Sequence, residues 1–149
     1  MTEYLEFTLD KFTFKVATDR LYNPEGVWVI EEGERVTLGL SDFFQQSNGD
    51  VAFAEMPPEG TRIAFGEEIA SIETIKVDVD VPSPVTGAIV EVNPAMEMEP
   101  EAINLDPYGA GWLVVIEADD WEADRVRLLD PEAYLAHIKI EAEEELKKG

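Results

Sequence analysis

Lysine is scarce in the middle of this chain. Lys76 is the only lysine between Lys15 and Lys139. An exposed lysine amine can be acylated, so a solitary lysine could carry a covalently attached group. The chain has no cysteine and a single histidine, His137, which rules out disulfides, thiolate metal sites and cysteine nucleophiles and leaves little other metal chemistry. The count alone favours an ordinary solvated side chain. The residues around Lys76 must therefore show whether it is an attachment site.

The segment around Lys76 predicts a hairpin. Apolar and polar residues alternate from Ile69 to Val81, and the phase of the alternation changes near Ile75 to Val77. A chain reversal or a bulge leaves such a change, because side chains swap faces there. We therefore expect Lys76 at the tip of a tight β-turn, with its amine in water where a ligase could reach it. We expect Gly66 and Gly87, one on each side, to occupy turns with unusual backbone angles.

Short strands and turns are predicted along most of the chain. The expected strands are FTFKVAT, GVWVIEE, Arg35–Leu40, Asp50–Glu55, Arg62–Glu67 with its turn, 85–93 with its turn, and Trp112–Ile116. Ser41 or Asp42 can cap a short helix that ends at Asn48-Gly49. Asp130, Pro131 and the terminal lysines predict a helix over about 131–148, whose apolar residues Tyr134, Leu135 and Ile138 should pack on the sheet.

These signals predict one mostly β domain over 1–149. We expect a hybrid β-sandwich of two small antiparallel sheets, with a hairpin core at about 60–100, short helices and the C-terminal helix. No stretch has the length of a membrane helix and the opening residues lack a secretory pattern, so we expect a cytoplasmic protein.

The acidic composition limits the partners. A formal net charge of −22 argues against nucleic acid and disfavours anionic membranes, and makes a monomer the expected state. Two interpretations of the net negative charge remain open. It could keep the protein soluble at high salt, or it could steer the chain toward partner enzymes with basic docking faces.

An ordered series of short motifs resembles the H proteins of the glycine cleavage system, a family of lipoyl carriers. The series is Val36-Thr37-Leu38-Gly39-Leu40-Ser41-Asp42, Gly49-Asp50-Val51, Pro58, Gly60, Gly66, Glu73-Thr74-Ile75-Lys76, Ser83-Pro84-Val85-Thr86-Gly87, Val90-Glu91-Val92-Asn93, Pro107-Tyr108-Gly109 and Gly111-Trp112-Leu113. It covers roughly residues 12 to 140. The resemblance implies a carrier rather than an enzyme, with lipoic acid attached covalently to Lys76 by a lipoate ligase or lipoyl transferase. The thiol chemistry would then belong to the cofactor, in a chain without cysteine.

Two features keep alternatives open. Biotin carriers load a lysine typically flanked by methionines, whereas Ile75 and Val77 flank Lys76, which leaves biotin a minor alternative beside an unmodified acidic binding module. The chain also departs from typical H proteins after the lysine, where it reads Val77-Asp78-Val79-Asp80-Val81-Pro82. Neutral sequence drift on an exposed edge would explain this departure as well as a change of partner enzyme would.

The change of partner gives our main functional hypothesis. It is an H-like carrier that serves a heterodisulfide-reductase-like complex in sulfur oxidation, and the alternative is an H protein that carries the aminomethyl group among the glycine cleavage enzymes. Glu73, Asp78 and Asp80 are our candidates for recognition by the ligase and the partners, because they lie nearest to Lys76 along the chain. No residue is assigned a catalytic or metal-binding role.

Overall fold

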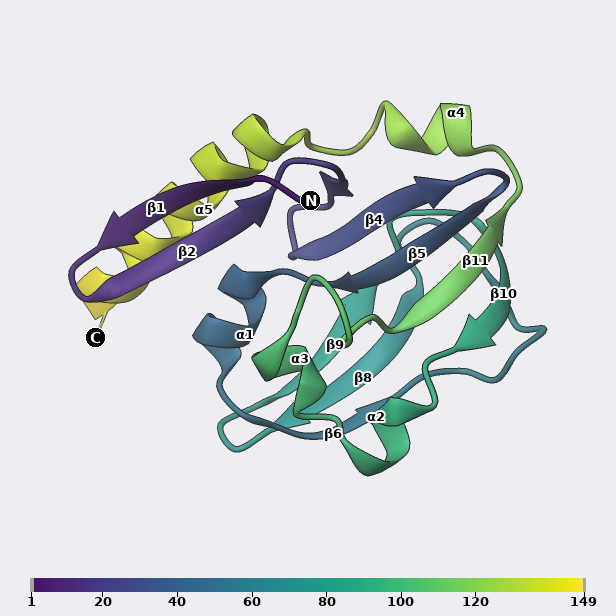
Figure 1. The fold of residues 1–149 in the computed structure, drawn as a ribbon, viewed down its shortest axis with the longest axis horizontal. Coiled ribbons are helices and arrows are strands. Elements are labelled where there is room, and N and C mark those ends of the chain that lie inside the picture. The colour runs from purple at the N-terminus through teal and green to yellow at the C-terminus, as the bar shows by residue number, and fades with distance from the viewer. Residues whose placement is uncertain (1, 149) are drawn as a thin grey trace.

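The structure is a computed structural model that describes residues 2–148, in which eleven strands and five helices are connected by short loops (Figure 1). The strands are β1 (Tyr4–Leu9), β2 (Phe12–Ala17), β3 (Leu21–Tyr22), β4 (Val27–Glu32), β5 (Arg35–Leu40), β6 (Val51–Glu55), β7 (Arg62–Ile63), β8 (Glu68–Thr74), β9 (Asp78–Pro82), β10 (Gly87–Val92) and β11 (Val114–Ala118). The helices are α1 (Asp42–Asn48), α2 (Ala95–Met98), α3 (Ala102–Leu105), α4 (Trp121–Arg125) and α5 (Pro131–Lys148).

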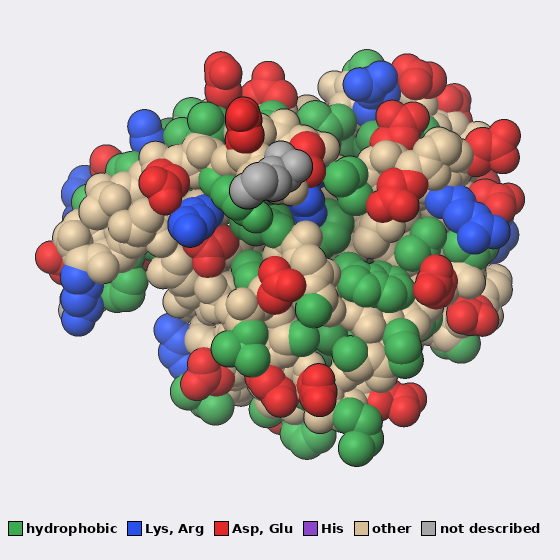
Figure 2. All heavy atoms as spheres, in the orientation of Figure 1, with side chains coloured by type: hydrophobic (Ala, Val, Ile, Leu, Met, Phe, Trp, Pro, Cys, Tyr) green, Lys and Arg blue, Asp and Glu red, His purple; other side chains and the backbone are tan. Residues whose placement is uncertain are grey.

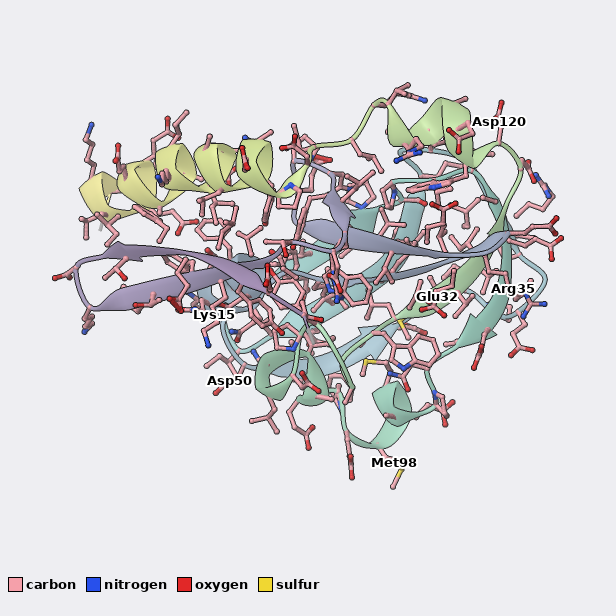
Figure 3. The ribbon with its side chains drawn as sticks, turned by 45° about the horizontal axis from the view of Figure 1, so that its top comes forward. Lys15, Glu32, Arg35, Asp50, Met98 and Asp120 are labelled. Atoms are coloured by element: carbon pink, nitrogen blue, oxygen red, sulfur yellow. The ribbon has the colours of Figure 1, made fainter. Side chains whose placement is uncertain are left out.

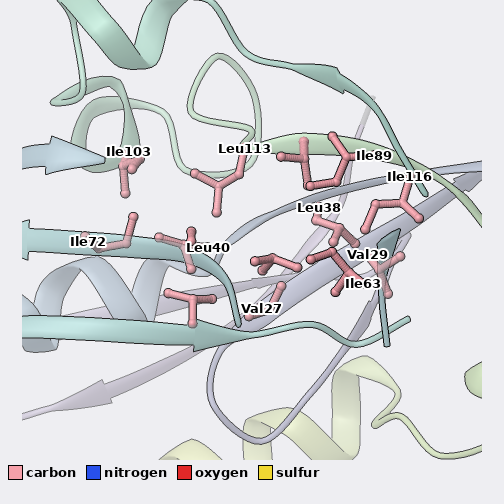
Figure 4. Close-up of a cluster of buried hydrophobic side chains, with 14 of the residues drawn as sticks. Val27, Val29, Leu38, Leu40, Ile63, Ile72, Ile89, Ile103, Leu113 and Ile116 are labelled. Carbon is pink, nitrogen blue, oxygen red and sulfur yellow. The ribbon is translucent and has the colours of Figure 1, made fainter. Parts of the chain in front are cut away.

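Two antiparallel sheets form the sandwich. The six-stranded sheet has the order β3-β4-β5-β11-β10-β7, and the three-stranded sheet has the order β6-β8-β9. Buried aliphatic side chains from both sheets form one cluster, which includes Val27, Leu38 and Ile116 from the larger sheet and Ile72 from the smaller one (Figure 4). Burial of these apolar surfaces holds the layers together. The mostly β hybrid sandwich with a C-terminal helix is thus confirmed.

A third sheet lies beside the sandwich. Strands β1 and β2 pair with each other alone, and this N-terminal hairpin and α5 project together from one side of the molecule (Figure 1). Helix α5 contacts β1, β2 and β3, and its Tyr134 ring stacks on Tyr22 with 4.3 Å between the ring centroids. The expectation of two sheets was therefore incomplete. The C-terminal helix also packs mainly on the hairpin, and it meets the larger sheet at β3.

Hydrogen bonds fasten the N-terminal hairpin to the sandwich. The backbone nitrogen of Lys15, labelled in Figure 3, donates to Asp42 Oδ2 at 2.9 Å. The Tyr108 hydroxyl donates to the Lys15 carbonyl at 2.7 Å, and burial raises the pKa of this phenol to about 12. Tyr22 donates to the Ala17 carbonyl at 2.7 Å.

The two predicted helix starts are confirmed. Ser41 Oγ accepts a hydrogen bond from the Phe44 nitrogen at 3.1 Å and so caps α1, which Gly49 ends. Asp130 Oδ1 accepts from the Ala133 nitrogen at 2.8 Å, and Pro131 is the first residue of α5. Strand β11 begins two residues later than expected, and β1, β3, α2, α3 and α4 were not predicted.

The prediction for Gly66 is confirmed and that for Gly87 is wrong. Gly66 has φ +90°, which favours glycine, whereas Gly87 lies inside β10 and its φ is not positive. A Cβ at Gly87 would lie 2.2 Å from the Glu117 carbonyl oxygen on β11. Gly87 is therefore required for the close approach of two strands.

Acidic side chains are scattered over the face shown in Figure 2, among hydrophobic ones, while Lys and Arg lie mainly toward its two ends. In residues 2–148 no helix combines the length and apolar character that would let it cross a membrane.

Candidate functional site

Lys76 lies exposed at the tip of the β8–β9 hairpin, as predicted. Strand β8 ends at Thr74 and β9 begins at Asp78, so the alternation changes phase at a chain reversal. The Thr74 nitrogen donates to the Val77 carbonyl at 2.8 Å. The Thr74 hydroxyl accepts from the backbone nitrogens of Lys76 at 3.2 Å and Val77 at 3.1 Å. This buried hydroxyl therefore fixes the turn that presents Lys76.

A second set of bonds supports the tip from below. The Ile75 nitrogen donates to the Asp50 carbonyl at 3.1 Å, and Asp50 lies beside α3 at the start of β6 (Figure 3). Asn104 of α3 holds the residues on both sides of Asp50, since its Oδ1 accepts from the Val51 nitrogen at 2.9 Å and its Nδ2 donates to the Gly49 carbonyl at 3.0 Å. The hairpin tip thus rests on a braced segment of backbone.

The Lys76 amine lies against the C-terminal end of α1. Its Nζ donates to the Ser47 carbonyl at 3.0 Å. The carbonyls of a helix C-terminus have no partner within the helix and carry partial negative charge, which favours a cation there. Gly49 lies beside the lysine chain, since a Cβ at this residue would be in van der Waals contact with Lys76 Cε, at 3.4 Å. Among residues 2–148, no carboxylate forms an ion pair with Lys76.

This environment fits an acylated lysine. The amine is accessible, and acylation would leave no carboxylate without its cation. An amide nitrogen keeps one hydrogen, which can still be donated to the Ser47 carbonyl. Lys76 is thus the residue at this site that could hold a covalent cofactor.

A cavity of about 290 Å³ begins at the same end of α1 and lies among α1, β9 and α5. Its lining includes Ser47 and the carboxylates of Glu25, Asp80, Glu141 and Glu145. The walls therefore favour a cationic guest over an anionic one.

The three predicted recognition residues lie along this hairpin. Glu73 and Asp78 are exposed and directly opposite each other across β8 and β9, next to the tip. Asp80 is further along β9 and is opposite Ser71. The Asp80 carboxylate raises the pKa of the exposed Glu68 carboxyl, because the two acidic groups repel. The structure brings the carboxylates together on one hairpin, and their role in recognition stays a prediction.

Apolar side chains are also exposed around Lys76. Ile75 is 76% exposed and Val77 is 44% exposed, on either side of the lysine. On the neighbouring strand β6, Phe53 lies opposite Glu73 and is 66% exposed. The tip therefore combines one cation, an apolar margin and flanking carboxylates.

Sequence reasoning missed the residues that position Lys76. For Thr74 a local signal existed, because a threonine hydroxyl commonly bonds to backbone nitrogens two and three residues later. Ser47 and Asn104 act across 29 and 53 residues, from Ser47 to Lys76 and from Asn104 to Val51. No local pattern marks such contacts.

Comparisons with known proteins agree on one family. Residues 20–141 match the family model described as "Glycine cleavage H-protein". The chain is 39% identical to a glycine cleavage system H protein of Thermus thermophilus, over 85% of this chain and 98% of that protein. It is 42% identical to one of Beutenbergia cavernae, over 81% of this chain and 94% of that protein. A crystal structure of a glycine cleavage system H protein from Mycobacterium marinum superposes with a TM-score of 0.74 and 30% identity, over 82% of this chain and 98% of that one.

The N-terminal hairpin lies outside the matched residues. The family match begins at Arg20, after β2, and ends at Glu141, within α5. Strands β1 and β2 and the last turns of α5 are therefore additions to the part of the chain that the family model describes.

Proposed function

Since the chain belongs to the glycine cleavage H-protein family, we propose that Lys76 carries the lipoyl group and that the protein passes the aminomethyl group among the glycine cleavage enzymes. H proteins of this family carry lipoate covalently on a lysine, and they are carriers rather than enzymes. When bound, the group supplies a dithiolane that opens to a dithiol, which a chain without cysteine lacks.

The position of Lys76 is the observation that carries the assignment. It is an exposed lysine at a hairpin tip, fixed by the Thr74 hydroxyl and supported through Asn104. Rigid support of the backbone beneath a mobile side chain lets a ligase or transferase find the amine in one place. Lys15 and Lys139, by contrast, lie on β2 and α5.

The acidic cavity supports an aminomethyl cargo. An aminomethyl group has an amine that is protonated at neutral pH, and the carboxylates of Glu25, Asp80 and Glu141 would attract it. The chain's own residues would thereby bind and shield the amine near Lys76 without any change in bonding.

The comparisons favour this function over our main hypothesis of sulfur oxidation. That hypothesis was based on the acidic run after Lys76, whereas the matched family and the relatives named above are those of glycine cleavage. Asp78 and Asp80 have a simpler interpretation as carboxylates that meet basic faces of the glycine cleavage enzymes, together with the apolar margin formed by Ile75 and Val77.

Intact-mass measurement tests the attachment. The full chain is expressed with lipoate and a lipoate ligase, and we expect one lipoyl adduct, which peptide mapping assigns to Lys76. The Lys76→Arg variant should show no adduct, while Lys139→Arg should be loaded like the wild type. A lipoyl adduct that survives in Lys76→Arg, a biotin adduct, or no adduct at all would contradict the proposal.

Exchange of labelled carbon dioxide into glycine tests the pathway. The loaded chain, mixed with glycine decarboxylase, should support this exchange, and the Lys76→Arg chain should not. A fully loaded chain that fails with the decarboxylase, but accepts electrons or sulfur from a heterodisulfide-reductase-like complex, would return the assignment to sulfur oxidation.

A further inference from the structure

An apolar groove of about 240 Å³ lies between the N-terminal hairpin and the last turns of α5. Leu9, Phe12 and Phe14 form its wall on the hairpin, and Ala142 and Leu146 form its wall on the helix. Phe12 remains 44% exposed and Leu146 remains 53% exposed. The groove thus leaves apolar surface uncovered that a ligand could bury.

This groove is separate from the acidic cavity and differs from it chemically. The two share only Ser47 and Glu145, and the Ser47 hydroxyl donates to Glu145 Oε2 at 3.3 Å. All five apolar residues of the groove lie outside residues 20–141, the part that matches the family model. The groove is therefore a feature that the family match does not describe.

One residue, Ser47, connects the groove with the amine of Lys76. Ser47 lines it, and the Ser47 carbonyl is the acceptor of Lys76 Nζ at 3.0 Å. A lipoyl arm attached to this nitrogen consequently starts next to Ser47, which lines both the apolar groove and the acidic cavity. Its direction then depends on whether it is apolar or charged.

We propose that the groove binds the lipoyl arm in its uncharged, unloaded form, an assignment that rests on the proposed attachment to Lys76. The arm is an uncharged hydrocarbon chain that ends in an apolar dithiolane, so burying it against Phe12 and Leu146 removes apolar surface from water. Placing the uncharged arm in the acidic cavity would instead remove water from the Asp80 and Glu141 carboxylates without giving them a hydrogen-bond partner. The N-terminal hairpin and α5 thereby form a binding site for the lipoyl arm that carries no aminomethyl group.

The test compares amide spectra of two mass-verified samples of the full chain, lipoylated wild type and unmodified wild type. We expect chemical-shift changes at Leu9, Phe12, Ala142 and Leu146 in addition to those at the hairpin tip. Chemical-shift changes confined to the tip and the end of α1 would overturn the proposal that the arm binds in the groove, and would leave the lipoyl attachment to Lys76 unaffected. Changes at Glu25 and Val79 alone would place the empty arm in the acidic cavity and overturn it as well. Failure to load Lys76 would overturn the proposed function first, and the mass spectrum reports that separately.

Reduction kinetics give a second readout. In the lipoylated protein, whose arm carries no aminomethyl group, dithiothreitol should reduce the dithiolane about tenfold more slowly than it reduces free lipoamide, because a bound arm reacts only while it is released. Leu146→Gln and Phe12→Thr should each raise the rate at least about threefold toward the free value. Ile140→Gln is the matched control, since Ile140 is 60% exposed on the same helix and does not line the groove. Equal rates in all these chains, or an equal increase in the control, would refute the proposal. Concentration-dependent rates would instead assign the groove to a second copy of the chain and would also refute it.

Discussion

The Thr74 hydroxyl lies 3.2 Å from the backbone nitrogen of Lys76, inside the turn that presents this lysine. The same oxygen accepts from Val77 and donates to the Val77 carbonyl at 3.1 Å. A single buried hydroxyl therefore provides hydrogen-bond partners for two backbone nitrogens and one carbonyl of the turn. The two central residues of this turn, Ile75 and Lys76, have no positive φ.

Thr74→Val should loosen this turn. Valine keeps the shape of the side chain but leaves the backbone nitrogens without their acceptor, so we expect a loss of about 1–3 kcal/mol in the free energy of unfolding. Lipoylation by the ligase should also slow. Urea denaturation and timed mass spectra measure the two effects. Thr37→Val on β5 is the control, because the described part of the chain shows no hydrogen bond for the Thr37 hydroxyl, and equal losses at both sites would contradict the role of Thr74.

Gly49→Ala should disturb the end of α1. Gly49 has φ +87° and ψ −168°, a conformation that residues with a Cβ adopt at a cost of about 1–3 kcal/mol. The new methyl group would also come into van der Waals contact with Lys76 Cε, at 3.4 Å, so the cost is expected from the backbone conformation. Gly33→Ala is a suitable comparison, because Gly33 has φ +71° in open space. We expect the larger drop in urea midpoint at Gly49, and a larger drop at Gly33 would refute this explanation.

Asn104→Ala should release the support beneath the hairpin. The substitution removes the bonds to Gly49 and Val51, which brace the Asp50 carbonyl that accepts from Ile75. We expect faster hydrogen exchange at the Ile75 amide, at least about tenfold if the local opening free energy falls by about 1.4 kcal/mol. Exchange at the Thr74 amide should change less, because its bond to Val77 lies within the hairpin. Unchanged exchange at Ile75 would show that α3 does not support the tip.

Glu68→Gln should stabilise the chain at neutral pH. Asp80 raises the pKa of Glu68 in the folded protein, so ionised Glu68 is disfavoured by folding above that pKa and the penalty is relieved as the pH falls. The gain from Glu68→Gln should therefore be present at pH 7 and disappear below the ordinary glutamate value, where the side chain is protonated in both states. Urea midpoints at pH 7 and pH 4 measure this difference. Glu59→Gln, in the turn before β7, is the control, and a gain that persists at pH 4 would contradict the mechanism.

Tyr108→Phe should weaken the attachment of the N-terminal hairpin. The substitution deletes the bond to the Lys15 carbonyl, and we expect a loss of about 1–2 kcal/mol. Because the pKa of Tyr108 is about 12, its phenol should remain protonated at pH 11 and the attachment should survive there. The difference in phenolate absorbance between wild type and Tyr108→Phe gives the titration directly. A Tyr108 signal that titrates near pH 10 would show that the phenol is not buried against the hairpin.

Local patterns were sufficient to predict the hairpin and both helix starts. The phase change at Ile75 to Val77 placed Lys76 at a reversal, and the cap residues Ser41 and Asp130 fixed where α1 and α5 begin. These features depend on residues that are close in sequence, and the printed sequence contains their full cause.

The remaining features depend on contacts that no local pattern encodes. Gly87 was expected in a turn because glycine suits turns, whereas its true constraint is the Glu117 carbonyl on another strand. Neither the partner of Lys76 Nζ at Ser47 nor the apolar groove between β2 and α5 could be predicted, since both arise where distant segments pack. The same holds for α5, whose apolar face was predicted correctly but whose main partner was the unpredicted hairpin.

Strand β9 is an edge strand of its sheet, and its exposed residues include Asp78 and Asp80. An uncovered edge can recruit a strand from another molecule, and a row of like charges makes such edge-to-edge zippering unfavourable. The charges of the two aspartates therefore disfavour pairing of this edge with the same edge of another copy. An edge strand that ends at an exposed hairpin tip thus carries its own electrostatic barrier to strand addition.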